Sequence, residues 1–231
     1  MREFPSRPLI IAIDGPSGAG KGTVARELAR RLDYMHLDTG AMYRAVAWKA
    51  LHEGTPLDDE NAVAEVARRA ALDVGPERVE IDGHDVTAAI RTPAIDRAAT
   101  SAARLPKVRA VLVARQREAG EKGGIVMEGR DIGTVVFPNA DVKIYLDASA
   151  EERARRRAAD PAHAMSRDAA AAEVAVEMEA RDRSDKTRAM SPLIVAPDAV
   201  EIDTTGLSVS EVVEKVMEIV ERRGGTGDPG I

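Results

Sequence analysis

The sequence lacks cysteine and has few aromatic residues. None of the 231 residues is Cys, which excludes disulfide frameworks, thiolate zinc sites, iron–sulfur clusters and cysteine nucleophiles. We therefore expect a reducing, cytoplasmic location. Phe, Trp and Tyr together make up 3% of the chain and the formal net charge is −6. The chain thus offers neither the stacking platforms nor the positive field of an extended nucleic-acid-binding protein.

Long hydrophobic runs are also missing. The first apolar run, Leu9 to Ile13, is far shorter than a signal-peptide core or a membrane span, so we expect no membrane association. Apolar residues (44%) and charged residues (31%) occur in globular proportions. The length fits a single domain over residues 1–231 that carries an insertion.

Short apolar strands alternate with amphipathic helices along the chain. Leu9 to Ile13 has the continuous apolar pattern of a strand buried on both faces, and Thr23 to Leu32 follows as a helix. This alternation predicts an α/β fold, a parallel sheet flanked by helices on both faces. Further strands are expected at 125–127, 142–146 and 200–202, and further helices at 41–52, 108–119, 151–159, 169–181 and 211–222.

Residues 57–100 break this alternation and are predicted to form a small α+β insertion. A helix is expected at 61–71, and a hairpin is expected from 78–81 through a turn at Asp82-Gly83. The segment 224–231 lacks apolar anchors and is expected to be a disordered tail.

Two helix starts carry the spacing of a capping box. Ser149 is followed by Glu152, and Ser208 by Glu211, so that each side chain can bind a free backbone N–H of the other residue. We expect helices to begin at both serines.

One glycine-rich segment follows the first predicted strand and matches the pattern G-x-x-x-x-G-K. Such a loop turns several backbone N–H groups and a helix N-terminus towards one anion, and its lysine reaches the outer phosphates. The alternative is an ordinary glycine-rich strand-to-helix turn. We predict ATP as co-substrate, bound by Gly15, Pro16, Ser17, Gly18, Ala19, Gly20, Lys21, Gly22 and Thr23.

The residue after Lys21 departs from the usual pattern. A Ser or Thr normally follows the lysine and binds Mg²⁺, but here Gly22 precedes Thr23. We expect Mg²⁺ to be held mainly by phosphates and water, and we predict no protein metal site. The four histidines have no paired spacing that would indicate metal ligation.

The loop alone fits an ATPase, a GTPase or a small-molecule kinase. The Asn/Thr-Lys-x-Asp tetrapeptide that recognises guanine does not occur in the sequence. The basic residues are 26 Arg and 7 Lys, and the planar guanidinium group suits phosphate oxygens, although codon bias explains the excess equally well. These observations leave an ATP-dependent kinase or a nucleotide-dependent regulatory module.

Four motifs in order resemble the bacterial cytidylate kinases, a family of P-loop nucleoside monophosphate kinases. The resemblance extends from about residue 9 to 222 and implies transfer of the γ-phosphoryl group of ATP to CMP or dCMP; UMP or another small acceptor is the alternative. It also implies a helical lid over residues 150–190. The motifs are Gly15 to Thr23, Leu37 to Arg44, Glu128 to Pro138 and Arg181 to Arg188.

The same resemblance implies roles for individual residues. Arg44, Arg130 and Arg188 would bind the acceptor phosphate beside Thr39, while Arg181 and Asp185 would hold the ribose. Thr100 or its neighbour Ser101 would contact cytosine together with Arg109 and Asp131. A carboxylate accepts from the cytosine amine but not from the uracil carbonyl, so Asp131 should reject UMP. The catalytic group would be Lys21, Arg130, Arg188 and Arg157.

The lid assignment leaves choices open. Four arginines follow the capping residue Ser149: Arg153, Arg155, Arg156 and Arg157. At helical spacing only some of them can point into one cleft, so a solvated face is equally consistent with the pattern. Likewise, Arg130-Asp131 could be a simple ion pair. The partners expected are nucleotides only, and the chain is expected to be a monomer.

Overall fold

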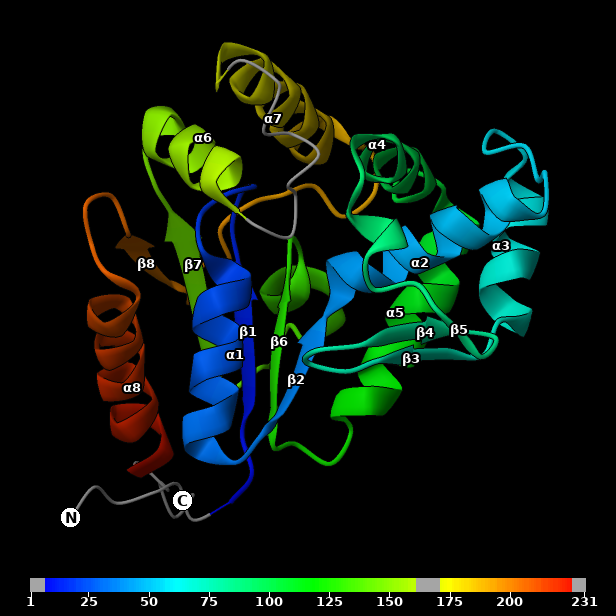
Figure 1. Ribbon diagram of the computed structural model, residues 1–231. Coiled ribbons are helices and arrows are strands. Elements are labelled where there is room, and N and C mark those ends of the chain that lie inside the picture. The colour runs from blue at the N-terminus through cyan, green and yellow to red at the C-terminus, as the bar shows by residue number, and fades with distance from the viewer. Residues whose placement is uncertain (1–6, 161–170, 226–231) are drawn as a thin grey trace.

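The computed structural model describes residues 7–160 and 171–225, and its centre is a five-stranded parallel sheet (Figure 1). The strands lie in the order β2-β6-β1-β7-β8. This arrangement confirms the predicted α/β fold. The strands are β1 (Ile10–Asp14), β2 (Met35–Asp38), β6 (Ile125–Gly129), β7 (Val142–Asp147) and β8 (Val200–Asp203).

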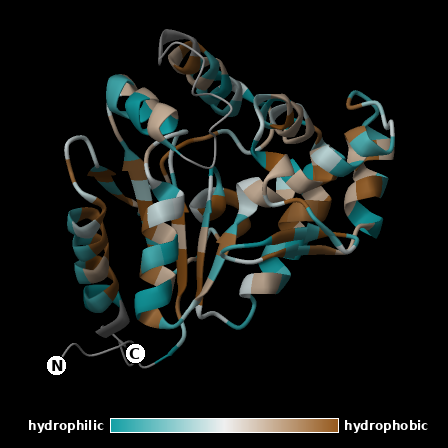
Figure 2. Cartoon of the chain, viewed as in Figure 1, coloured by the Kyte–Doolittle hydropathy of each residue, from teal (hydrophilic) through white to brown (hydrophobic). Residues whose placement is uncertain are grey.

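Helices cover both faces of the sheet. Ile11 and Ile13 of β1 enter one hydrophobic layer, which is completed by α1 (Lys21–Leu32) and α8 (Val209–Gly225). Ala12 enters the opposite layer, to which α2 (Thr39–His52) and α5 (Pro106–Gly120) contribute. Figure 2 shows the hydrophilic residues of α8 on its outer side. Because β1 is buried on both faces, its sequence is continuously apolar.

A small antiparallel sheet, β3-β4-β5, lies beside α2 and is followed by two short helices. The predicted hairpin is confirmed: its turn residues Asp82 and Gly83 have φ of 50° and 77°. The sequence patterns did not predict the strand β2 or the helix α4. The part of the chain that follows α2 forms α3 (Glu60–Arg69), β3 (Leu72–Val74), β4 (Val79–Ile81), β5 (His84–Asp85), the 3₁₀-helix η1 (Ala89–Arg91) and α4 (Pro93–Ala102).

Two helices lie above the C-terminal ends of the strands, next to α4 (Figure 1). They are α6 (Ala150–Ala159) and α7 (Ala171–Thr187), and a one-turn π-helix, η2 (Ile132–Val136), follows β6. α7 extends beyond the expected end at residue 181, and the expected start at 169 lies outside the described residues. α8 runs to Gly225, so the predicted tail begins inside this helix, and residues 226–231 lie outside the described part.

The two predicted capping boxes have different outcomes. At α8 both bonds form: Glu211 N–H donates to Ser208 Oγ at 3.3 Å, and Ser208 N–H donates to Glu211 Oε2 at 2.8 Å. At α6, Ser149 Oγ accepts from Glu152 N–H at 3.2 Å, but the N–H of Ser149 donates to Thr205 Oγ1 instead. The box at α6 is therefore only half formed.

In residues 7–160 and 171–225, no helix combines the length and the hydropathy that a bilayer crossing requires.

Candidate active site

The glycine-rich loop joins β1 to α1 at the C-terminal edge of the sheet. Gly20 has a φ of 91° and precedes the helix with no side-chain cap, which leaves the first N–H groups of α1 directed outward. Lys21 begins α1, and its Nζ donates to Pro16 O at 2.7 Å. Burial, followed by the nearby Arg130 guanidinium, lowers the pKa of Lys21 to about 7. An anion in the loop would counteract both effects.

Two glycines let other parts of the fold touch this loop. A Cβ at Gly15 would lie 2.0 Å from Leu146 O of β7. A Cβ at Gly18 would lie 2.7 Å from Arg153 O of α6, and φ at this position is 75°. Any side chain here would force the loop away from β7 or α6. The loop glycines are therefore needed for close packing as well as for anion binding.

Gly22 stands against a buried carboxylate that the sequence analysis did not select. A Cβ at Gly22 would lie 3.0 Å from Glu128 Oε1. The same oxygen is 3.1 Å from His36 Nε2 of β2, and both side chains are buried. Within the described residues no group of three or more His, Cys, Asp or Glu side chains could hold a metal ion. Glu128 lies directly beside the loop residue that follows Lys21.

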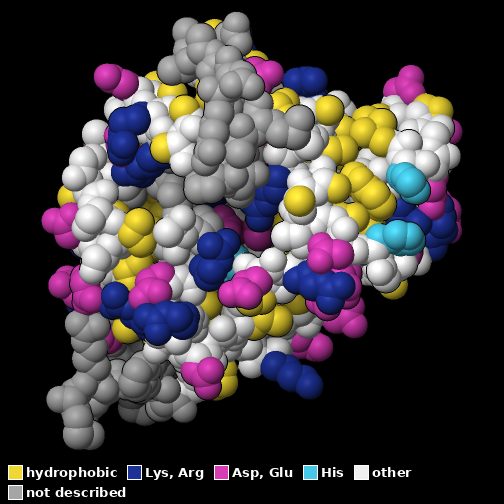
Figure 3. All heavy atoms as spheres, viewed as in Figure 1, with side chains coloured by type: hydrophobic (Ala, Val, Ile, Leu, Met, Phe, Trp, Pro, Cys, Tyr) yellow, Lys and Arg dark blue, Asp and Glu magenta, His cyan; other side chains and the backbone are white. Residues whose placement is uncertain are grey.

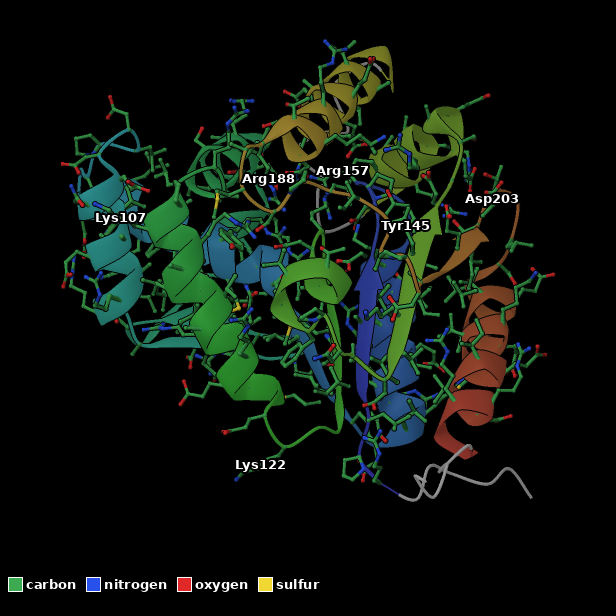
Figure 4. The ribbon with its side chains drawn as sticks, turned by 180° about the vertical axis from the view of Figure 1, so that it is seen from behind. Lys107, Lys122, Tyr145, Arg157, Arg188 and Asp203 are labelled. Atoms are coloured by element: carbon green, nitrogen blue, oxygen red, sulfur yellow. The ribbon has the colours of Figure 1, made fainter. Side chains whose placement is uncertain are left out.

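One cavity of about 680 Å³ connects the loop with the predicted acceptor residues. In Figure 3, Lys and Arg side chains gather around the central recess of this face, and Figure 4 shows Arg157 and Arg188 in the upper part of the fold from behind. The lining includes residues 17–23 of the loop together with Thr39, Arg44, Thr100, Arg109, Arg130, Asp131, Arg157, Arg181, Asp185 and Arg188. Residues from α2, α4, α5, α6, the α7 region and the turn after β6 thus face the same space as the loop.

Two of the predicted phosphate-binding arginines are held by carboxylates. Arg44 Nη2 binds Asp38 Oδ2 at 2.8 Å, next to the start of α2. Arg130 Nε binds Asp185 Oδ2 at 2.9 Å, and its Nη2 donates to Ser17 Oγ at 2.9 Å. Each guanidinium group is therefore oriented before any ligand is present.

Arg188 and Thr39 complete the predicted phosphate-binding group. Arg188 Nη2 lies 3.4 Å from Asp131 Oδ1, and Arg188 Nη1 lies 3.8 Å from Asp185 Oδ1. Thr39 Oγ1 donates to Glu128 O at 2.7 Å. Within the described residues, the buried Nη2 of Arg188 has no hydrogen-bond acceptor. This N–H group can therefore still donate to a ligand.

The predicted base-binding residues lie together at the acceptor side. Asp131 and Arg109 form a buried ion pair, and the Arg109 guanidinium lies 5.7 Å from the ring centre of Tyr43. Thr100 lines the cavity, and its Oγ1 donates to Asp96 O at 2.8 Å. The neighbouring Ser101 is exposed, and its Oγ donates to the backbone of its own helix. Of these two residues, Thr100 therefore faces the cavity and Ser101 does not.

Asp96 of α4 binds two predicted site arginines at once. Its Oδ1 is 3.2 Å from Arg181 Nη1 of α7, and its Oδ2 binds Arg157 Nη2 of α6. Asp96 also lies one turn before Thr100 on α4. The carboxylate thus connects the predicted ribose-binding arginine with the predicted lid arginine. The sequence patterns gave no signal for this contact, because its partners lie 61 and 85 residues away.

The other arginines of α6 differ in their surroundings. Arg153 turns inward and donates to Ser17 O at 3.0 Å. Arg156 donates to Thr204 Oγ1 at 2.8 Å, close to Gly20 of the loop. Arg155 forms an exposed ion pair within α6. Arg155, Arg156 and Arg157 line the cavity, whereas Arg153 is used to bind the loop backbone.

Asp14 is a further buried group that the sequence analysis did not select. Its two carboxylate oxygens accept from the N–H groups of Ile132 and Gly133 at 2.9 and 2.8 Å. Burial raises the pKa of Asp14 to about 6. Asp14 ends β1 directly before the loop, and Ile132 follows the predicted base contact Asp131. Its hydrogen bonds therefore fix the distance between the loop and the base-binding residues.

Comparison with known sequences identifies close relatives. The family model "Cytidylate kinase" matches residues 11–222. A cytidylate kinase from Geobacillus kaustophilus is 50% identical over 95% of this chain and 99% of its own. A cytidylate kinase from Solibacter usitatus is 47% identical over 98% of both chains.

Solved structures agree at the level of the fold. A gluconokinase from Sinorhizobium meliloti matches with a TM-score of 0.51 at 14% identity, covering 97% of this chain and 96% of its own. An uncharacterized protein from Eubacterium ventriosum gives a TM-score of 0.53 at 9% identity, covering 92% and 98%. The family model and the two sequence relatives extend over nearly the whole chain, which therefore belongs to the cytidylate kinase family.

Proposed function

We propose that the chain transfers the γ-phosphoryl group of ATP to CMP or dCMP, giving ADP and CDP or dCDP. Its family supports this proposal, because relatives that align over nearly the whole chain are named cytidylate kinase. One structural observation carries it: a single cavity is lined both by the phosphate loop and by a group of arginines. Nothing in the comparisons favours UMP as the acceptor.

The loop is the proposed binding site of the ATP phosphates. The N–H groups at the start of α1 and the buried Lys21 ammonium would face the β- and γ-phosphates. The cavity continues past the loop to the β8–α8 connection, where Leu207 and Val209 line it. These apolar side chains suit the adenine ring, and Arg156 lies between them and the loop.

The acceptor phosphate is proposed to bind between Arg44, Arg130 and Arg188. Arginine suits this task because its planar N–H groups match phosphate oxygens in pairs. The buried Nη2 of Arg188 and Nε of Arg44 have no hydrogen-bond partner within the described residues, so both can donate to a phosphate. Thr39, at the start of α2, lies next to this group, and its hydroxyl would have to turn from Glu128 O to donate to a phosphate oxygen.

Cytosine is proposed to be recognised by Asp131 and Arg109, with Thr100 beside them. The Asp131 carboxylate would accept from the exocyclic amine, and the Arg109 guanidinium would donate to ring acceptors of the base. UMP presents a carbonyl where CMP has the amine, so it would place a second acceptor against the buried Asp131 carboxylate instead of a donor. Arg181 and Asp185 are proposed to hold the ribose hydroxyls.

Catalysis by this arrangement would rest on position and charge. The acceptor phosphate is already an anionic nucleophile at neutral pH, so no general base is required. Lys21, Arg130, Arg188 and Arg157 would neutralise negative charge as it shifts between the two nucleotides. Arg157 reaches the cavity from α6, where it now binds Asp96.

Mg²⁺ is proposed to accompany ATP. Glu128 and Thr23 fit the ion, because both line the cavity beside the lysine of the loop. The close approach of Glu128 to Gly22 leaves little room for another side chain, which agrees with an ion held mainly by phosphates and water. When bound, the ion would screen the charge of the triphosphate.

Several broader expectations remain proposals. They are one P-loop kinase domain over the whole chain, an acceptor-binding insertion at 57–100 and a lid at 150–190. The described parts of the last two segments include α3, α4, α6 and α7, and α4, α6 and α7 each contribute residues that line the cavity. A monomeric state, a cytoplasmic location and the absence of nucleic-acid partners also stay predictions.

A coupled assay of ADP release tests the proposed function. The chain is incubated with ATP and Mg²⁺, and CMP, dCMP, UMP and AMP are compared as acceptors. We expect CMP and dCMP to stimulate ADP release strongly and UMP to do so weakly. Turnover of UMP equal to that of CMP would overturn the cytosine assignment of Asp131. A chain that releases no ADP with any monophosphate would instead be a regulatory module.

A further inference from the structure

Ser17 of the phosphate loop is held by three different parts of the fold. Its N–H donates to Asp182 Oδ1 of α7 at 3.0 Å, and its carbonyl accepts from Arg153 Nη1 of α6 at 3.0 Å. Its hydroxyl oxygen accepts from Arg130 Nη2 at 2.9 Å. Every polar group of Ser17 is thus bound, and 7% of the residue is exposed.

Asp182 and Arg153 also bind each other. Asp182 is 6% exposed, and an ion pair joins it to the Arg153 guanidinium. A buried carboxylate requires such a partner, because an unpaired charge in the protein interior is strongly unfavourable. Arg153 Nε is fixed in turn by Ala148 O at 3.1 Å. The pair therefore forms a rigid support for the two peptide units on either side of Ser17.

Arg130 connects Ser17 with a residue that is proposed to bind the acceptor. Its Nη2 binds the Ser17 hydroxyl, and its Nε binds Asp185 at 2.9 Å. One continuous set of hydrogen bonds therefore runs from Asp182 through Ser17 and Arg130 to Asp185. Ser17 is part of the phosphate loop and Asp182 supports it, whereas Arg130 and Asp185 are proposed acceptor contacts.

We propose that Asp182, paired with Arg153, is a positioning residue that orients Arg130 for the acceptor phosphate through Ser17. Asp182 fixes the peptide of Ser17, and this peptide sets the direction of the hydroxyl that holds Arg130. Without that hold, the guanidinium group samples more conformations, and binding a phosphate must restrict them. The inference rests on the proposed role of Arg130 in acceptor binding.

A double-mutant cycle on the full chain tests the inference. The affinity for CMP is measured by titration calorimetry, with a non-hydrolysable ATP analogue present, in the wild type, Asp182→Asn, Ser17→Ala and the double variant. We expect each single substitution to weaken CMP binding about fivefold, and the double variant to bind about as weakly as the weaker single variant. Effects that multiply, or an Asp182→Asn variant within twofold of the wild type, would refute the proposal.

Controls separate positioning from general damage to the fold. Arg183→Gln changes an exposed arginine on the same helix that pairs with Glu179, and it should leave CMP affinity unchanged. A loss of CMP binding caused only by destabilised helices would not be cancelled by Ser17→Ala. If Asp182→Asn fails to fold, Arg153→Lys takes its place in the cycle and the same non-additivity is required. Wild-type chain that does not bind CMP would refute the proposed function itself.

Discussion

The carboxylate of Asp131 and the guanidinium group of Arg109 form an ion pair that is almost completely removed from solvent. This pair faces the cavity at the end opposite the phosphate loop. Because its charges cannot be solvated by bulk water, an incoming base must supply the hydrogen bonds that water would otherwise make. The pair is therefore the part of the site in which selectivity between bases should be concentrated.

Replacing Asp131 by Asn should lower selectivity for CMP. The NH₂ group of Asn can face the amine of cytosine, and two donors then meet without an acceptor. The substitution also removes the negative charge that pairs with Arg109. We expect kcat/KM for CMP to fall about 100-fold and that for UMP to fall much less. The same substitution at the exposed Asp58 is the matched control. An unchanged ratio of CMP to UMP would contradict the assignment.

Lys21→Ala should act mainly on turnover. The Lys21 ammonium lies where negative charge shifts during transfer, so its contribution should be greatest in the transition state. We expect kcat to fall about 100-fold or more, while the affinity for CMP changes only slightly. Lys215→Ala, on the exposed side of α8, serves as control. Steady-state kinetics with both substrates varied distinguishes a loss of kcat from a rise in KM.

Binding of ATP should be accompanied by proton uptake at Lys21. Burial lowers the pKa of this amine to about 7, so at about pH 8 it is mainly neutral in the free protein. A triphosphate in the loop favours the charged form and raises the pKa, so a proton is taken up. Calorimetry in buffers of different ionisation heat measures this uptake. Equal uptake in Lys21→Met would show that another group is responsible.

Arg181→Ala should weaken acceptor binding more than it slows transfer. Arg181 is proposed to hold ribose, which does not change charge in the reaction. We therefore expect KM for CMP to rise about tenfold with a smaller change in kcat. Arg183→Ala, two residues away and exposed, is the control. A fall in kcat with unchanged CMP affinity would exclude the ribose role.

Asp14 should make the protein less stable as the pH rises. Burial raises its pKa from 3.8 to about 6, so the folded state holds this proton more tightly than the unfolded state. The stabilising contribution is complete below the unfolded pKa and is lost as the pH rises through about 6. Between about pH 4.5 and about pH 7.5, the unfolding free energy of Asp14→Asn should improve by about 2 kcal/mol relative to the wild type. Denaturant unfolding of both proteins across this pH range measures the difference. Unfolding free energies of the two proteins that change in parallel with pH would contradict the prediction.

The sequence predicted the elements whose signals are local. β1 has a continuous apolar run, the loop has its glycines and lysine, and α8 has both bonds of its capping box. β2 was missed because it is four residues long with His36 and Asp38 among them. α4 was missed although Thr92 caps it and Pro93 begins it, because its buried residues are mostly alanine and give a weak apolar pattern.

The partners of the predicted site residues could not be inferred in the same way. The motifs predicted Arg130 and Arg181 as site residues, and the expected lid predicted Arg157, but the carboxylates that bind them are set by the packing of α4, α6 and α7. Asp96 carries no local signature that separates it from other acidic residues of an acidic chain, and Glu128 and Asp182 lie within two of the motifs without a pattern that predicts their partners. The capping box at α6 lacks its second hydrogen bond for a related reason, because Thr205 from a distant turn binds the N–H of Ser149.

The double contact of Asp96 with Arg157 and Arg181 has a consequence for the order of events in the cavity. A nucleotide that engages either arginine must compete with a carboxylate already bound to it. Part of the attraction between ligand and protein is therefore used to separate an existing ion pair, which weakens net affinity. When the ligand departs, the same carboxylate can re-form both contacts, so the exchange that lowers affinity also assists release of the products.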